Sequence, residues 1–206
     1  DTPVTFEFVA QTQSSREVEI RARVAGFLDK RQYTEGDLVK TGQVLFQMDR
    51  KPFEAALVSA QGQLAQQQAR WEVAKATLAR VRPLAAQNAV SKMDLDNAVG
   101  AERETKAAVL AAEGEVRTAQ LNLSYTTISS PLNGLSSDAK KQEGSYVTPG
   151  ESGLLTSVSQ MDPMYVNFSL SENEIQSFRD QEKRGLMRTP RDRNYVVEII
   201  LVDGSL

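Results

Sequence analysis

Two long segments rich in alanine and glutamine decide the fold of this chain: residues 52–86, PFEAALVSAQGQLAQQQARWEVAKATLARVRPLAA, and residues 92–123, KMDLDNAVGAERETKAAVLAAEGEVRTAQLNL. The first carries mostly apolar residues at alternating steps of three and four, the heptad pattern of a coiled-coil seam: Phe53, Leu57, Ala60, Leu64, Gln67, Trp71, Ala74, Leu78, Val81 and Ala85. The second repeats this pattern, interrupted by Glu102: Leu95, Ala98, Thr105, Val109, Ala112, Val116, Ala119 and Leu123. Each segment therefore predicts a helix of roughly 45–50 Å.

The turn between these segments, residues 87–91, is too short for parallel helices, so the pattern predicts an antiparallel hairpin. Ser91 and Asp94 have the spacing of a capping box that begins the second helix. Asn88 is suited to a left-handed cap at the end of the first helix. Pro83 removes one backbone hydrogen bond, so we expect a kink or a loosened last turn there. The expected hydrophobic staple beside the capping box consists of Val90 and Leu95.

The predicted seam is thin, because alanines fill one of its two rows in each helix. Burial per heptad is then modest, and the hairpin could gain stability by packing on neighbouring copies. Trp71 lies near the middle of the first helix and needs an opposing residue of modest size. The spacing predicts Thr105 or Val109 opposite it.

Composition excludes several classes of function. The 206 residues carry a net charge of −3 with the signs interspersed, whereas nucleic-acid binding needs a concentrated basic face. With no His and no Cys, the chain lacks serine–histidine and cysteine–histidine nucleophile pairs and the usual zinc and copper sites. Neighbouring carboxylates, Asp94 with Asp96 and Glu172 with Glu174, lie at predicted helix starts, where we interpret them as caps. No catalytic, cofactor-binding or metal-binding residue is predicted.

We expect a soluble protein or mature fragment, because no apolar run is long enough to span a bilayer and no signal peptide is recognisable. The absence of Cys leaves the compartment open, since many exported proteins also lack disulfides.

Short β elements flank the hairpin. Alternating apolar residues predict strands around Phe6, residues 18–24 and residues 44–48. Five features then recur 108 positions further along the chain, which indicates an internal repeat with the hairpin between its copies: Ile20, Gly26, Glu35-Gly36, Val39 and Gly42 match Ile128, Gly134, Glu143-Gly144, Val147 and Gly150. Neither half can bury a core alone, so the two halves should pair into one β-sandwich. Residues 48–52 and 123–127 should then lie side by side where the hairpin emerges.

A third unit follows the second half-motif. Residues 164–170 alternate as a strand, and Ser171 with Glu174 forms a second capping box for a helix that should end at Gly185. Residues 195–202 are apolar and predict a last strand. We expect this unit to need further chain to complete its sheet.

The sequence resembles the periplasmic adaptor, or membrane fusion, proteins of Gram-negative tripartite efflux pumps, most closely the resistance-nodulation-division type. The matching stretches are EVEIRARVAGFLDKRQYTEGDLVKTGQVLFQMDRKPFEAAL, LSYTTISSPLNGL, EGSYVTPG and VSQMDPMYVNFSLSENEI. The resemblance implies an elongated α+β multidomain protein: a lipoyl-like β-sandwich split by an antiparallel α-helical coiled-coil hairpin, with a partial β-barrel domain that includes one short helix. The implied domains are the N-terminal barrel strand, 1–15; the lipoyl-like halves, 16–51 and 125–158; the hairpin, 52–124; and the incomplete barrel, 159–206.

The hairpin tip, RVRPLAAQNAVSKMDLD, resembles the family pattern whose residues dock onto an outer-membrane channel. The matching residues are Arg80, Leu84, Ser91 and Asp96. Pro83 departs from that pattern. Without the resemblance, Ser91 is interpreted as a cap, Leu84 as a seam residue and Arg80 as a solvated charge.

The resemblance implies a non-catalytic adaptor in the periplasm, associated with the inner membrane. Its implied partners are a resistance-nodulation-division transporter, an outer-membrane channel and further copies of itself in a ring, a hexamer or trimer of dimers; it implies neither a cofactor nor nucleic acid. One alternative is an adaptor of an ABC-driven export system, generally with a longer hairpin. Another is a lipoyl or biotinyl carrier, which would present a modified lysine in the turn that the hairpin replaces here. The lipid-anchoring Cys of many adaptors is absent.

Overall fold

The computed structural model describes residues 6–186 and 197–200, which fall into two compact units. Residues 14–163 form one unit, and the described parts of residues 1–13 and 164–206 form the other. The first unit contains strands β2 (Glu17–Arg21), β3 (Gly26–Arg31), β4 (Leu38–Val39), β5 (Val44–Met48), β6 (Thr127–Ser129), β7 (Gly134–Ser136), β8 (Tyr146–Val147) and β9 (Leu154–Ser159), the short 3-10 helix η1 (Glu151–Gly153), and the long helices α1 (Lys51–Ala86) and α2 (Lys92–Ser124).

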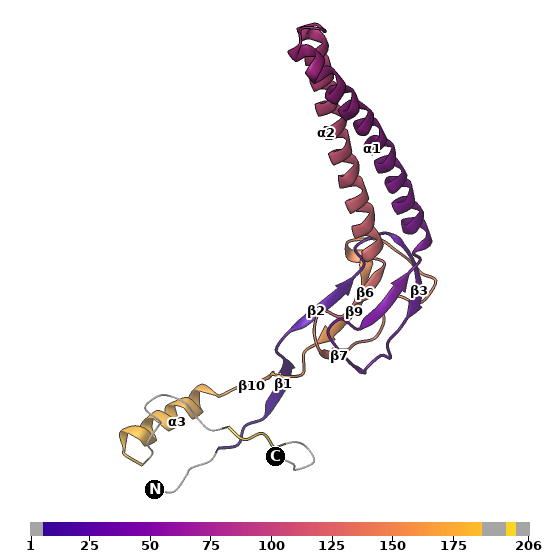
Figure 1. Ribbon diagram of the computed structural model, residues 1–206. Helices are drawn as coiled ribbons and strands as arrows, with labels where there is room; N and C mark the ends of the chain where they lie inside the picture. Colours follow the sequence, from indigo (N-terminus) through magenta and orange to yellow (C-terminus); the bar gives the residue numbers. More distant parts are fainter. Residues whose placement is uncertain (1–5, 187–196, 201–206) are drawn as a thin grey trace. The chain divides into compact units, whose positions relative to one another are not determined.

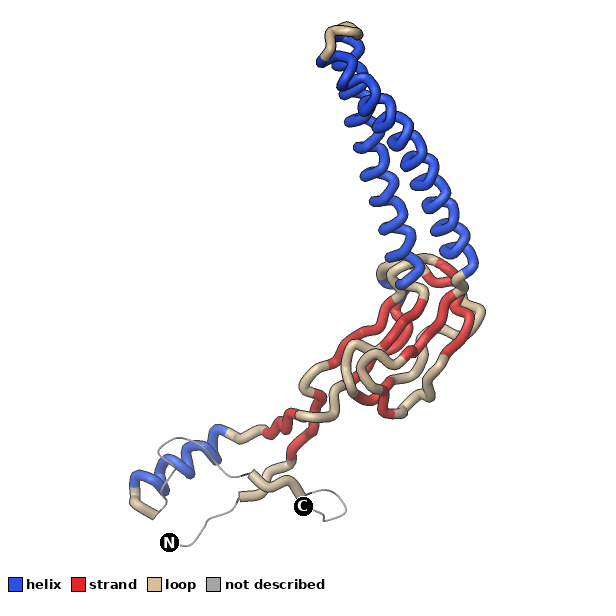
Figure 2. The backbone as a smooth tube through the Cα atoms, viewed as in Figure 1, coloured by secondary structure: helices blue, strands red, loops and turns tan. Residues whose placement is uncertain are grey.

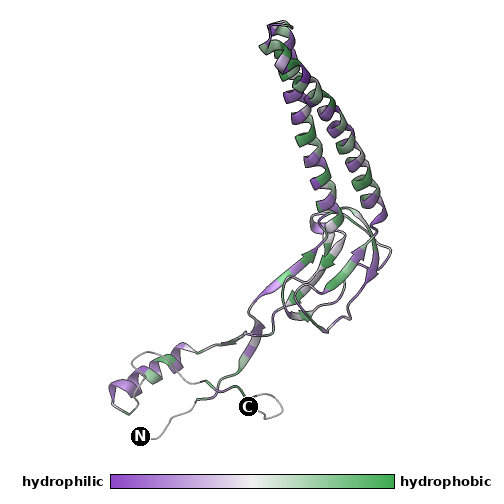
Figure 3. Ribbon diagram, in the orientation of Figure 1, coloured by the Kyte–Doolittle hydropathy of each residue, from purple (hydrophilic) through white to green (hydrophobic). Residues whose placement is uncertain are grey.

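Helices α1 and α2 form the predicted antiparallel hairpin (Figures 1 and 2). Every predicted seam position is buried or half-buried. The seam is as thin as its alanines suggest, because α1 buries no residue completely and α2 buries only Ala98, Val109 and Ala112. Apolar and polar residues therefore alternate along both helices in Figure 3, without an apolar face that is wide enough to form a core of its own.

The hairpin interrupts a β-sandwich made of two four-stranded sheets, with strand orders β2-β9-β7-β4 and β6-β5-β3-β8. The backbone N–H of Met48 donates to the carbonyl of Thr126 at 2.8 Å, so the two ends of the hairpin lie side by side as expected. Phe53 at the base of α1 and Tyr125 just after α2 pack against the sandwich core. The largest fully buried side chains contribute roughly 1.5–3 kcal/mol each through the hydrophobic effect: Phe46, Leu28, Leu45, Met48 and Leu155.

The two halves of the sandwich exchange equivalent strands, which confirms the internal repeat. Gly26 pairs with Val147, and the residues 108 positions away from these two, Gly134 and Val39, pair with each other. Gly36 and Gly144 both adopt positive φ, at 79° and 82°. The N–H of Gly36 donates to the carbonyl of Ser136. Likewise, the N–H of Gly144 donates to the carbonyl of Leu28, which is the residue 108 positions before Ser136. An approximate two-fold relation therefore links the halves.

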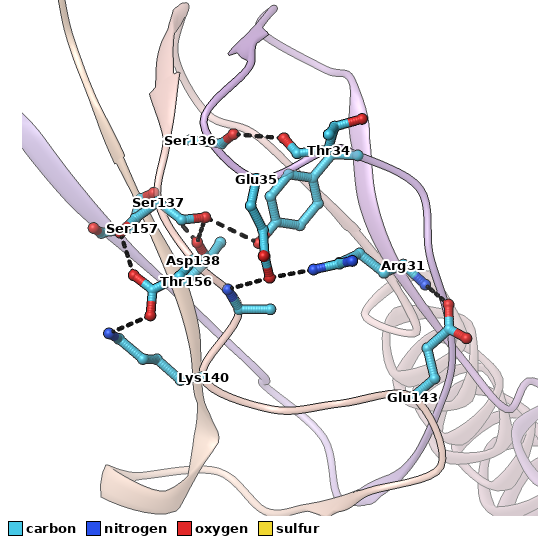
Figure 4. A network of polar contacts seen from close by, with 12 residues as sticks. Arg31, Thr34, Glu35, Ser136, Ser137, Asp138, Lys140, Glu143, Thr156 and Ser157 are labelled. Atoms are coloured by element: carbon cyan, nitrogen blue, oxygen red, sulfur yellow. Dashed lines mark hydrogen bonds and ion pairs between the residues drawn. The ribbon is translucent and has the colours of Figure 1, made fainter.

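Two glutamates at equivalent positions of the repeat each accept a hydrogen bond from the other half (Figure 4). The Glu35 carboxylate accepts from the backbone N–H of Ala139 at 2.9 Å, and the Glu143 carboxylate accepts from that of Arg31 at 2.8 Å. Because 35 and 143, and 31 and 139, differ by the same offset, each half closes a loop of the other in the same way. Arg31 also forms an ion pair with Glu35.

The repeat offset changes at one place. Strand β9 matches β5 at an offset of 110, because η1 inserts two residues after Gly150. Register shifts still occur at equivalent points, between Ile20 and Arg21 opposite β9 and between Val44 and Phe46 opposite β6.

The other unit pairs β1 (Ala10–Ser14) with β10 (Met164–Phe168) and contains α3 (Glu172–Lys183). The prediction of a strand around Phe6 is wrong, because the described residues 6–9 form no strand and β1 begins at Ala10. The two phenylalanines that alternate there pack against other aromatic rings instead. The ring centroids of Phe6 and Phe178 lie 4.5 Å apart, and those of Phe8 and Phe168 lie 5.8 Å apart.

Helix α3 begins at the predicted capping box, and Gly185 follows it with φ of 70°. The predicted strand at 195–202 lies partly outside the described residues, and the described part, 197–200, forms no strand.

Candidate functional site: the hairpin tip

The turn at the hairpin tip is held by a capping box. The Ser91 hydroxyl accepts from the Asp94 backbone N–H at 3.1 Å, and the Asp94 carboxylate accepts from the Ser91 backbone N–H at 3.2 Å and from its hydroxyl at 2.7 Å. Asn88 has φ of 57°, the predicted left-handed conformation. Val90 and Leu95 are half-buried, as staple residues should be. The sequence thus fixes the local shape of the tip.

Helix α1 continues through Pro83 to Ala86. Pro83 cannot donate to the carbonyl four residues earlier, but Pro83 and Ala79 are both exposed, so water can satisfy that carbonyl. The N–H of Ala89 donates to the Leu84 carbonyl at 2.9 Å, which closes the end of the helix. The expected kink at Pro83 stays a prediction.

All four predicted docking residues are exposed. Arg80 and Leu84 are one helical turn apart and share a face of α1. Ser91 and Asp96 begin α2, but five positions separate them, so they do not share a face. Leu84 is 43% exposed, which excludes its interpretation as a seam residue.

The charged groups at the tip are free to meet a partner. Within the described hairpin, the one contact found for Arg80 is a 3.4 Å hydrogen bond from its guanidinium to the Thr77 hydroxyl, and Asp96 has none. A guanidinium in this state can form several directed hydrogen bonds to carbonyls or carboxylates.

Three further exposed residues at the tip were not predicted from the sequence. Met93 is 69% exposed, its chain neighbour Lys92 is exposed, and so is Arg82 near the end of α1. Met93 is neither a seam position nor part of the staple, and this was the available signal that its apolar side chain has no structural role. The tip therefore presents two apolar side chains, Leu84 and Met93, among cations.

In each acidic pair one residue is a cap, as interpreted from the sequence, whereas Asp96 and Glu172 form no capping hydrogen bond in the described part of the chain. Asp94 completes the capping box of α2, and Glu174 completes that of α3, where the backbone N–H of Ser171 lowers the pKa of the Glu174 carboxyl. Among residues 6–186 and 197–200, no group of three or more acidic, His or Cys side chains could hold a metal ion. Across the same ranges, no helix is both long and apolar enough to cross a membrane.

Comparison with known proteins places this hairpin in a family. Residues 56–126 match the domain described as "RND MFP, alpha-helical hairpin domain". The efflux pump periplasmic linker BepD of Brucella suis biovar 1 (strain 1330) is 40% identical over 207 residues, which covers 100% of this chain and 52% of BepD. The multidrug efflux pump subunit AcrA of Escherichia coli (strain K12) is 32% identical over 201 residues, covering 98% of this chain and 50% of AcrA.

Solved structures give the same result. The crystal structure of MacA from Actinobacillus actinomycetemcomitans aligns with a TM-score of 0.59 and 28% identity over 81% of this chain and 56% of that chain. A MacA–MexA chimera that contains the Pseudomonas aeruginosa MexA α-hairpin domain aligns with a TM-score of 0.58 and 30% identity, over 82% of this chain and 57% of the chimera. The chain spans about half the length of the relatives it matches.

Proposed function

The chain belongs to the membrane fusion proteins of the resistance-nodulation-division type, and from this premise we propose that it acts as a non-catalytic periplasmic adaptor in a multidrug efflux pump. Similarity over almost the whole chain to proteins named as efflux linkers and subunits is the observation that carries the proposal. The adaptor bridges an inner-membrane transporter and an outer-membrane channel, and several copies assemble into a ring beside the inner membrane.

In this proposal the hairpin tip is the surface that docks onto the channel. Arg80 supplies directed hydrogen bonds, Leu84 an apolar contact, and Ser91 and Asp96 polar contacts at the start of α2. The exposure of all four side chains supports this role. The capping box of Ser91 and Asp94 also supports it, because it holds the turn in shape without using Arg80, Leu84 or Asp96. Residues 1–15 and 159–206 are assigned to the β-barrel domain, and residues 16–51 and 125–158 to the lipoyl-like domain.

Arg80→Asp tests the docking surface. An exposed charge contributes little to stability, so the free energy of unfolding should stay within about 1 kcal/mol of the wild-type value. Efflux-dependent resistance of cells that rely on this protein should be lost. Arg70→Asp is the matched control, because Arg70 is exposed on the same helix roughly 15 Å further from the tip.

Ser91→Asn separates capping from docking, because Asn caps a helix about as well as Ser does and its side-chain amide can still donate to the Asp94 carboxylate. If Ser91 contacts the channel, this variant keeps its melting temperature and loses resistance because the side chain is larger. Retained resistance in both Arg80→Asp and Ser91→Asn would remove the tip from the functional account.

A further inference from the structure

Trp71 and Glu102 form a polar contact across the hairpin seam. The indole Nε1–H of Trp71 donates to a Glu102 carboxylate oxygen at 2.8 Å, and both side chains are half-buried. Within the fully described hairpin this is the only hydrogen bond that joins the side chains of α1 and α2. Thr105, the other polar seam residue nearby, bonds to the carbonyls of Ala101 and Glu102 in its own helix.

The indole is also held from the α1 side. The ammonium of Lys75, one turn further along α1, lies 5.1 Å from the centroid of the Trp71 ring, within the range of a cation–π contact. Lys75 thus covers the face of the ring, while the edge with the N–H meets Glu102. The orientation of the indole is therefore set by both helices.

The rest of the seam specifies the helix positions poorly. Alanine rows look alike from one heptad to the next, so small slides or rotations change their packing little. Nearer the sandwich the helices leave an open groove of about 310 Å³, which is lined by Ala60 and Ala119 of the seam and by neighbouring polar residues. Apolar side chains there do not fill the space between α1 and α2.

We infer that Trp71 and Glu102 are positioning residues that fix the axial offset and rotation of α2 against α1, and so determine how the tip residues are presented. A slide or rotation of the helices separates the indole N–H from the carboxylate, and this costs the hydrogen bond in a seam where both groups are only partly open to water. A single polar pair in a coiled-coil seam is a known way to select one register. The structural part of this inference stands alone, and its consequence for docking rests on the proposed function.

Distance measurements between spin labels at two exposed positions near the tip, Ala79 and Asn97, test the inference in the 206-residue chain. Glu102→Leu removes the acceptor but supplies an apolar seam residue, so a simply structural role predicts an equal or higher melt and an unchanged distance. We expect instead a distance distribution that broadens or shifts by a large fraction of a helical turn, about 5 Å. Trp71→Phe, which keeps a smaller aromatic ring in the seam and loses the N–H, should act in the same direction.

Two variants serve as controls. Glu102→Gln keeps an oxygen acceptor for the indole and should retain the wild-type distance. Leu78→Ala weakens seam packing but keeps the polar pair, so it should lower the melt and leave the distance unchanged. Wild-type distributions in both Glu102→Leu and Trp71→Phe would overturn the inference.

Efflux-dependent resistance then separates this inference from the proposed function. Altered distances together with lost resistance support both. Altered distances with full resistance support the positioning pair and contradict docking by a tip of fixed geometry.

Discussion

Replacing Gly134 by alanine should destabilise the sandwich, whereas the same change at Gly26, its equivalent in the repeat, should be nearly neutral. A Cβ on Gly134 would lie 2.3 Å from the carbonyl oxygen of Ser159 and 2.8 Å from its carbonyl carbon. These are backbone atoms of β9, the neighbour of β7 in its sheet. At Gly26 the nearest atom is the methyl carbon of Met48, 3.2 Å away at the end of a flexible side chain.

The difference in cost follows from what must move. Overpacking costs typically 1–3 kcal/mol, and we expect about 3 kcal/mol at Gly134, because β9 must shift as a whole and its pairing with β2 and β7 with it. Alanine recovers roughly 0.4–1 kcal/mol by restricting the unfolded chain, which leaves a net loss of about 2–3 kcal/mol. At Gly26 a small rotation of Met48 suffices, so the net change should stay within about 1 kcal/mol.

Thermal unfolding of both variants measures this difference. For a unit of this size, 1 kcal/mol corresponds to about 2–4 °C, so Gly134→Ala should melt roughly 4–12 °C below wild type, and Gly26→Ala within a few degrees of it. Equal melting temperatures for the two variants would refute the argument, because they would mean that β9 yields as easily as a methionine side chain.

Two other changes have defined outcomes. Ser91→Ala removes the cap of α2 and should lower the free energy of unfolding by about 1 kcal/mol, whereas Ser91→Asn, which can cap the helix and still donate to Asp94, should be close to wild type; equal losses in the two variants would mean that the capping box does not stabilise the hairpin. Burial raises the pKa of the Tyr33 hydroxyl, so the stability from its neutral form is fully present below its unfolded pKa of about 10 and is lost as the pH rises through the higher folded pKa. Denaturant midpoints at pH 8 and pH 11 should therefore differ less in Tyr33→Phe than in wild type, and an equal alkaline loss in both proteins would contradict this assignment.

The hairpin could be predicted almost completely, because each feature that determines it is local. Heptad spacing places a residue on the seam through the geometry of its own helix, and the capping box at Ser91 needs only residues three positions apart. Exposure at the tip depends on which apolar residues are left without a structural role. Because Val90 and Leu95 were already expected to occupy the staple positions, the exposure of Met93 could have been predicted, and it was missed.

The hydrogen-bond partner of Trp71 was not predicted. Thr105 or Val109 was expected to pack opposite the indole, which stays a prediction, and the structure adds a bond from the indole N–H to Glu102. The pairing of two antiparallel helices depends on how many residues the turn consumes and on how the seam side chains meet, so heptad spacing alone does not identify this contact. Glu102 was recorded only as an interruption of the heptads, although a polar residue in a seam indicates a polar partner on the other helix.

The sandwich shows why a hairpin can be inserted at this point of the repeat. In one half, Met48 meets Thr126 at the base of the hairpin, and the equivalent residues of the other half, Val158 and Val18, pair at the opposite end of the domain without one. The sheet therefore closes in the same way whether or not a hairpin joins its strands. Sequence changes in α1 and α2 can consequently alter the hairpin while the sandwich core stays intact, so long as Phe53 and Tyr125 keep the base of the hairpin packed on that core.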